Sequence, residues 1–198
     1  MGRHRDDVGA RTGMWLFLFT EILLFGGLFM LYSVFRIKYA VEFHKAAEDL
    51  NRIAGAANTA VLLTSSLAMA LSIAAVRRGQ KDLSVFFQGT TVLLGCVFLV
   101  VKYFEWSTKI SHGIYPNSPV LLDLARGEIL FYGLYFVMTG LHGLHVVLGL
   151  GLLGFMLAST IKGKINQDDF VRLENSGLYW HLVDIIWVYL FPLFYLVT

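Results

Sequence analysis

Two ionisable residues stand three positions apart inside the last apolar segment of the chain. His181 and Asp184 lie between Trp180 and Trp187, in a run that is otherwise soluble in hydrocarbon. Residues three apart are neighbours on one face of a helix, and ionisable groups inside a membrane are costly enough that they usually mark function or tight packing. The pair could carry protons or ions, or it could form a buried hydrogen bond that locks two helices. We favour the packing role, because polar groups also hold membrane helices together.

A carboxyl group lies deep in the first apolar segment. Glu21 follows Gly13, the start of that segment, by eight residues, which places it about 12 Å into a hydrocarbon layer about 30 Å thick. Desolvation disfavours the charged form of a carboxyl group at this depth. We therefore expect Glu21 to be protonated, or paired with a histidine or arginine from another helix.

Two imidazoles share one face of the fourth apolar segment near mid-membrane. His142 and His145 invite a metal or haem interpretation, but a transition-metal site needs three or more convergent donors, and haem needs an imidazole on each open face of its iron. His181 lies about four residues from the inner end of its predicted helix, so we expect it at a different depth. Cys96 stands alone and cannot supply paired thiolates. The sequence therefore predicts no metal site in this chain.

The third apolar segment carries a lysine and a glutamate near its outer end. Lys102 and Glu105 are three residues apart, a spacing that allows an ion pair along one helix. A lysine near a helix end can extend its ammonium group to the lipid headgroups. We expect an interfacial ion pair in which Lys102 snorkels outward.

The elements that carry these residues follow from composition. The chain has 198 residues, of which 57% are hydrophobic and 15% charged, and its mean hydropathy is +0.64. Its apolar runs are long enough to span a bilayer as helices, and they lack the two-residue alternation of barrel strands. We predict an all-α integral membrane bundle that forms a single transmembrane domain over residues 1–198. Its five transmembrane helices are predicted at residues 13–35, 53–76, 83–106, 128–161 and 177–198.

Basic residues in the connections predict the orientation. An inside N-terminus places nine Lys and Arg residues in the cytoplasm against six outside, so we expect an N-in, C-out topology. The nine are Arg3, Arg5, Arg11, Arg77, Arg78, Lys81, Lys162, Lys164 and Arg172. The connection 36–52 is predicted to hold a short amphipathic helix at the interface, and 107–127 an ordered turn. A net charge of +2, spread over several loops, does not indicate nucleic-acid binding.

Five short motifs occur in order along the predicted helices. They are Arg11-x-Gly13-Met14 before Glu21; Asn58-Thr59 with Leu62-Leu63-x-Ser65-Ser66; Glu105-Trp106; Thr139-Gly140-x-His142-Gly143-x-His145-Val146 with Gly149; and Glu174 before Tyr179-Trp180-His181-x-Val183-Asp184-x-x-Trp187. Through these motifs the chain resembles subunit III of the haem-copper oxidases over almost its whole length. It lacks the first two helices of the seven-helix members, in which a V-shaped cleft holds phospholipid. Loss of an even number of helices preserves the family's N-in, C-out orientation.

The resemblance implies an accessory role in aerobic electron transport. Such a subunit packs on subunit I of a proton-pumping oxidase that also contains subunit II, and it supports proton uptake and active-site integrity. Haem and copper are expected on those partner subunits, and phospholipid on this chain. Glu21, His142, His145, His181 and Asp184 would form one buried hydrogen-bonded network. Arg11 and His181 would hold lipid headgroups, and the membrane would be the bacterial inner membrane.

Two other functions remain compatible with these residues. Five-helix relatives also occur with nitric oxide reductases, so the catalytic partner could contain iron in place of copper. A freestanding proton channel or carrier is disfavoured, because we find no inverted repeat and the first helix offers little polar surface. The electron donor of an oxidase partner could be cytochrome c or quinol.

Overall fold

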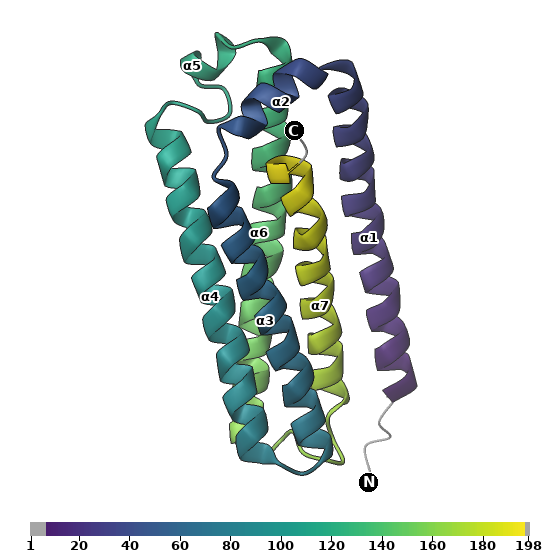
Figure 1. Cartoon of the computed structure of the whole chain (residues 1–198). Helices are drawn as coiled ribbons and strands as arrows, with labels where there is room; N and C mark the ends of the chain where they lie inside the picture. The colour runs from purple at the N-terminus through teal and green to yellow at the C-terminus, as the bar shows by residue number, and fades with distance from the viewer. Residues whose placement is uncertain (1–6, 197–198) are drawn as a thin grey trace.

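The computed structural model describes residues 7–196, which form a bundle of five long helices and three short elements (Figure 1). The long helices are α1 (Asp7–Lys38), α3 (Arg52–Arg77), α4 (Lys81–Ser111), α6 (Arg126–Ile161) and α7 (Val171–Phe191). The short elements are α2 (Ala40–Glu48), α5 (Pro119–Leu122) and the π-helical segment η1 (Pro192–Leu196). Arg3 and Arg5, which entered the charge count, and the last two residues of the predicted fifth helix lie outside the described residues.

The five predicted spans are confirmed as long apolar helices, but most of their ends lie beyond the predicted bounds. α1 begins six residues early, at Asp7, and α7 begins six residues early, at Val171. Hydropathy marks only the segment that fits the hydrocarbon layer, whereas a helix continues through the headgroup region.

Both predicted connections contain short helices. The amphipathic helix predicted within 36–52 is α2, which buries Phe43 against the end of the bundle and leaves Val41 exposed. Figure 1 shows α2 crossing the same end as α5. Asn51 then starts α3, because its side-chain oxygen accepts a hydrogen bond from the Ala54 amide at 3.0 Å. The turn predicted at 107–127 is shorter than expected, since α4 continues to Ser111 before α5 begins.

α1 differs from the other long helices in how little of it the bundle buries. Only 11% of its most apolar window is buried, against 50% for the helix that ends the chain. α1 contacts α6, α7 and α2 at one side of the bundle, while α3, α4, α6 and α7 pack on one another (Figure 1). Most of the α1 surface is therefore left for lipid or for another protein.

Glycines allow the bulkiest side chain of α7 to enter the bundle. A Cβ atom at Gly95 would lie 2.8 Å from the Trp180 ring, and one at Gly149 would lie 2.9 Å from it. Trp180 is completely buried between them. Small residues at such crossings let membrane helices approach closely, so these two glycines fix how α4 and α6 sit on α7.

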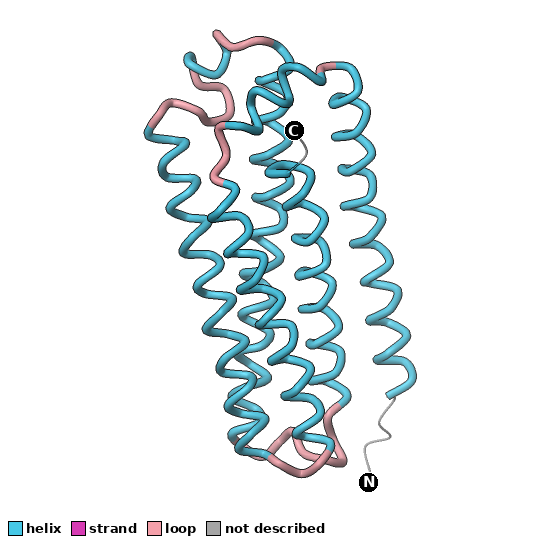
Figure 2. Tube along the Cα trace, in the orientation of Figure 1, coloured by secondary structure: helices cyan, strands magenta, loops and turns pink. Residues whose placement is uncertain are grey.

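The described chain consists of helices joined by loops, and the loops lie at the two ends of the bundle (Figure 2). Pro192 has no amide hydrogen to donate, so the regular α-helix ends at Phe191 and the wider turn of η1 follows. The Tyr32 hydroxyl donates to the Leu193 carbonyl oxygen, which ties η1 to α1. Tyr195 is thereby turned into the bundle, where it is fully buried.

Candidate functional site

Glu21 of α1 pairs with His145 of α6. Glu21 Oε2 lies 2.9 Å from His145 Nε2, and 14% and 10% of the two side chains are exposed. His145 Nδ1 lies 2.7 Å from the Leu141 carbonyl oxygen, which can only accept, so Nδ1 carries a proton. A single further proton is then shared between Nε2 and the carboxyl group. The pair is electrically neutral whichever atom holds that proton, which is what a site in hydrocarbon requires.

His181 of α7 contacts a serine of α3. His181 Nδ1 lies 2.6 Å from Ser66 Oγ. His181 lies about 15 Å along α7 from its start at Val171. Ser66 belongs to the motif Leu62-Leu63-x-Ser65-Ser66, but nothing in the sequence indicated that it would meet His181.

The side chains of His142 and Asp184 form no hydrogen bond with any residue in 7–196. His142 is fully buried and packs against the Phe98 and Trp187 rings, whose centroids lie 5.5 and 5.3 Å from its own and 4.8 Å from each other. Asp184 is 2% exposed, and neither carboxyl oxygen has a partner. Residues 7–196 thus hold two separate pairs and two isolated groups in place of the single network predicted from sequence.

The three histidines belong to separate contacts. His145 bonds Glu21, His181 bonds Ser66, and His142 packs only against rings. Among residues 7–196 no group of three or more His, Cys, Asp or Glu side chains is placed to hold a metal ion. The mid-membrane chemistry of the described chain is that of proton donors and acceptors.

Lys102 and Glu105 are buried, and the prediction that Lys102 snorkels outward was wrong. The Lys102 ammonium lies 3.2 Å from Glu105 Oε2, 3.1 Å from the Tyr135 hydroxyl and 3.0 Å from the Tyr195 hydroxyl. Tyr135 donates to Glu105 Oε1 at 2.6 Å, and Tyr195 donates to the same atom. All three ammonium donors find acceptors inside the bundle, so the side chain has no reason to extend to the headgroups.

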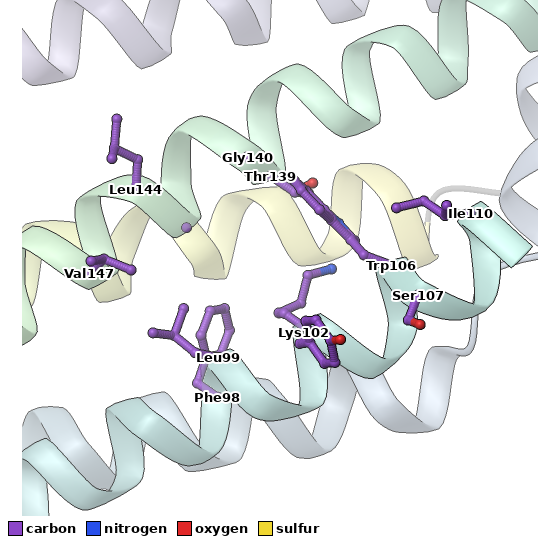
Figure 3. Close-up of a pocket in the computed structure, with 12 residues that line it drawn as sticks. Phe98, Leu99, Lys102, Trp106, Ser107, Ile110, Thr139, Gly140, Leu144 and Val147 are labelled. Carbon is purple, nitrogen blue, oxygen red and sulfur yellow. The ribbon is translucent and has the colours of Figure 1, made fainter. Parts of the chain in front are cut away.

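We call these four residues, Lys102, Glu105, Tyr135 and Tyr195, the outer cluster. It joins α4, α6 and η1, and its charges sum to zero. The tyrosines were missed because a tyrosine in an apolar run gives no signal of its partner. A groove of about 460 Å³ opens beside the cluster between α4 and α6. Figure 3 shows Lys102 and Trp106 reaching across from α4 in this groove, with Thr139 and Gly140 on the α6 side.

A second hollow, of about 620 Å³, opens at the other end of the bundle, where α1, α3 and α7 meet. We call it the inner cleft, because the predicted N-in orientation would place this end inside, and the name of the outer cluster follows the same prediction. Arg11, Arg77, Arg78, Glu174 and His181 are among its lining residues. Arg11 bonds Glu174 Oε2 at 2.8 Å and Arg77 bonds Glu174 Oε1. The two residues predicted to hold lipid headgroups therefore line one cleft, and it is rich in positive charge.

Comparison with known proteins identifies the class to which this helical membrane bundle belongs. The sequence profile of the family described as cytochrome c oxidase subunit III matches residues 1–198. A cytochrome c oxidase subunit 3 from Thermostichus vulcanus is 30% identical over 94% of this chain and 86% of its own length. A cytochrome bo(3) ubiquinol oxidase subunit 3 from Pseudomonas aeruginosa is 28% identical over 98% of this chain and 88% of its own.

A third relative is longer. A haem-copper oxidase subunit I+III from Aeropyrum pernix is 30% identical over 94% of this chain, which spans only 22% of that relative. The chain belongs to the cytochrome c oxidase subunit III family. It is therefore an integral membrane subunit of the haem-copper oxidase type, and it associates with an oxidase complex.

Proposed function

We propose that this chain is the non-catalytic subunit III of a proton-pumping cytochrome c or quinol oxidase and that it packs directly on subunit I. The observation that carries the proposal is the Aeropyrum pernix relative, a haem-copper oxidase subunit I+III whose name joins the two subunits. Two parts of one chain stay at high effective concentration, which suits parts that work in contact. Haem and copper then reside on subunits I and II, in a bacterial inner membrane.

Affinity purification tests the partner. The chain is tagged after Thr198, extracted from native membranes in mild detergent and analysed for subunits, haem and metals. We expect subunits I and II with haem and copper. Recovery of an iron-containing catalytic subunit without copper would identify the nitric oxide reductase alternative.

The chain itself is proposed to bind neither haem nor metal. Expressed without partners and purified in detergent, it should show no Soret absorbance and no stoichiometric copper, iron or zinc. The separate contacts of the three histidines support this expectation. Metal that copurifies at one equivalent and is lost in His142→Ala would overturn it.

The inner cleft is proposed to receive the headgroup of a phospholipid, at the cytoplasmic end of an N-in bundle. Arg78 lines the cleft with no ion-pair partner among residues 7–196, and Arg11 and His181 offer further donors. Anionic phosphate is attracted to such a site by charge and by hydrogen bonds. Arg78→Gln should lower the phospholipid phosphorus retained per purified complex. Equal retention in Arg78→Gln and in Lys38→Gln, a control at the opposite end of α1, would contradict the proposal.

Proton uptake by the oxidase is proposed to depend on this subunit through its mid-membrane groups. The Glu21–His145 pair is one candidate for this role, because its proton can sit on either partner without changing the net charge. For this particular pair we favour a structural role, in which it holds α1 against α6. The contrast between amide and alanine variants of Glu21, given below, separates the two.

A further inference from the structure

Asp184 is a buried carboxyl group that forms no hydrogen bond within residues 7–196. It is 2% exposed, it lies about 20 Å from the start of α7, and neither oxygen has a hydrogen-bond partner in residues 7–196. No salt bridge of the described residues includes it. A carboxylate buried without a cation or a donor takes up a proton rather than remain charged. Asp184 therefore rests as a neutral acid.

A polar route leads from Asp184 to the inner cleft. His181 lies one turn earlier on the same helix and lines the cleft. Its Nδ1 is 2.6 Å from Ser66 Oγ, while no residue in 7–196 engages its Nε2. The Ser66 hydroxyl also acts as a donor toward the Asp184 carboxyl, although the contact is too loose to count as a formed hydrogen bond in this structure. Ser66 thus stands between the imidazole and the acid.

The route ends at Asp184. Beyond it on α7 lies Trp187, which is fully buried and donates its indole hydrogen to Thr59 Oγ1 at 3.0 Å. The other serine beside the route, Ser65, already accepts from Trp180 at 3.0 Å. A group reached from one side and closed on the other suits storage and return of a proton, not its passage through the membrane.

The other titratable groups near this route each have contacts of their own and are not part of it. On α6, His145 is paired with Glu21 of α1, and His142 is enclosed by the Phe98 and Trp187 rings. The charged groups facing His181 all lie in the inner cleft: Arg11 of α1, Arg77 and Arg78 of α3, and Glu174 of α7. Arg11 and Arg77 bond Glu174, so the carboxylate of the cleft has partners other than His181.

We propose that Asp184 is an intramembrane proton-holding site that exchanges its proton with the inner cleft through Ser66 and His181. In the loading direction a proton from cleft water binds His181 Nε2, and the Nδ1 proton passes to Ser66 Oγ. The original hydroxyl proton of Ser66 passes to the Asp184 carboxylate. Histidine and serine end neutral, the imidazole has changed tautomer, and one positive charge from the cleft has neutralised one carboxylate. Release is the reverse.

Exchange of the acid proton for deuterium tests this site. The inference deepens the proposed support of proton uptake, but infrared spectroscopy of the purified native complex needs no turnover, so the two can fail separately. The carbonyl stretch of a protonated acid is identified as the band that Asp184→Asn removes. On transfer to D2O we expect that band to shift, and we expect Ser66→Ala and His181→Phe to slow the shift by about tenfold or more.

Thr64→Ala is the matched control, because the Thr64 hydroxyl is exposed and bonds only the Ala60 carbonyl of its own helix. It should exchange at the wild-type rate. Ser66→Ala is a small change on a helix that keeps its backbone bonds, so retention of the complex can be checked for each variant. The proposal is overturned if Asp184→Asn removes no acid band. It is equally overturned if Ser66→Ala, in an intact complex, exchanges as fast as Thr64→Ala.

Discussion

The outer cluster and the buried face of α7 differ in whether their ionisable groups have hydrogen-bond partners. In the outer cluster the Lys102 ammonium meets three acceptors, and the Glu105 carboxylate accepts from three donors. On α7, Asp184 is buried to a similar degree with no hydrogen bond in the described chain. A saturated cluster can keep its charges and tie helices together, whereas an unsatisfied group must lose its charge and remains free to exchange a proton.

The largest effect is expected from removing one charge of the outer cluster. Glu105→Ala leaves the Lys102 ammonium buried without its counter-ion, and breaking such a pair costs about 3 to 5 kcal/mol. The change is measured as a lower unfolding midpoint of the detergent-solubilised complex. Combining it with Lys102→Met should recover most of the loss. If the double variant is as unstable as Glu105→Ala, the ion pair is not the source of the stability.

Glu21 tests whether a paired carboxyl group is structural. Glu21→Gln keeps the shape and a hydrogen bond to His145, so we expect assembly and oxidase turnover close to those of the wild type. Glu21→Ala opens a void and leaves His145 unsatisfied, each costing about 1 to 3 kcal/mol. Equal loss of turnover in the two variants, with both complexes assembled, would make Glu21 a proton-carrying residue.

His142 is a second buried side chain without a hydrogen bond, and it tests what such a group contributes to stability. Its ring nitrogens have no partner in residues 7–196, so His142→Phe removes no hydrogen bond there and changes the volume little. A swap of this kind costs less than about 1.5 kcal/mol. His145→Phe is the matched control on the same helix and should cost more, because Glu21 loses its partner. Similar unfolding midpoints for the two variants would contradict the difference in hydrogen bonding between His142 and His145.

The smallest effect is expected at the surface, where Lys45 of α2 bonds Glu128 Oε1 at 2.6 Å. The hydrogen bond and the charge of Glu128 raise the pKa of Lys45 above its ordinary value. A raised lysine pKa contributes stability that is complete below the unfolded-state pKa, near 10.4, and is lost as the pH rises through the folded-state value.

Lys45→Met should therefore lower the unfolding midpoint slightly at pH 8 and make no difference at strongly alkaline pH. The effect is small because the Lys45 ammonium is exposed to solvent, which screens the pair. A difference that is the same at both pH values would assign the effect to packing of the lysine stem.

The class of this protein and its helices are readable from the sequence because their causes are local. Hydropathy over about 20 residues decides whether a segment crosses a bilayer, and the five spans and the interfacial helix α2 follow from it. The histidines and carboxyl groups inside those spans could also be picked out, because each is costly wherever its helix goes. The choice of partner is different, since it depends on how far each helix is rotated and how deep it sits.

Only the tertiary structure decided which buried groups meet. It brought Glu21 to His145 across 124 residues of chain and seated Lys102 between two tyrosines from other elements. It also left Asp184 without a hydrogen bond in the described residues, while Ser66 bonds His181. A shift of one turn in α7, about 5.4 Å, would exchange these partners without altering the hydropathy of any segment. The hydropathy of each segment therefore determined that these groups lie in membrane helices, and packing determined which of them have hydrogen-bond partners.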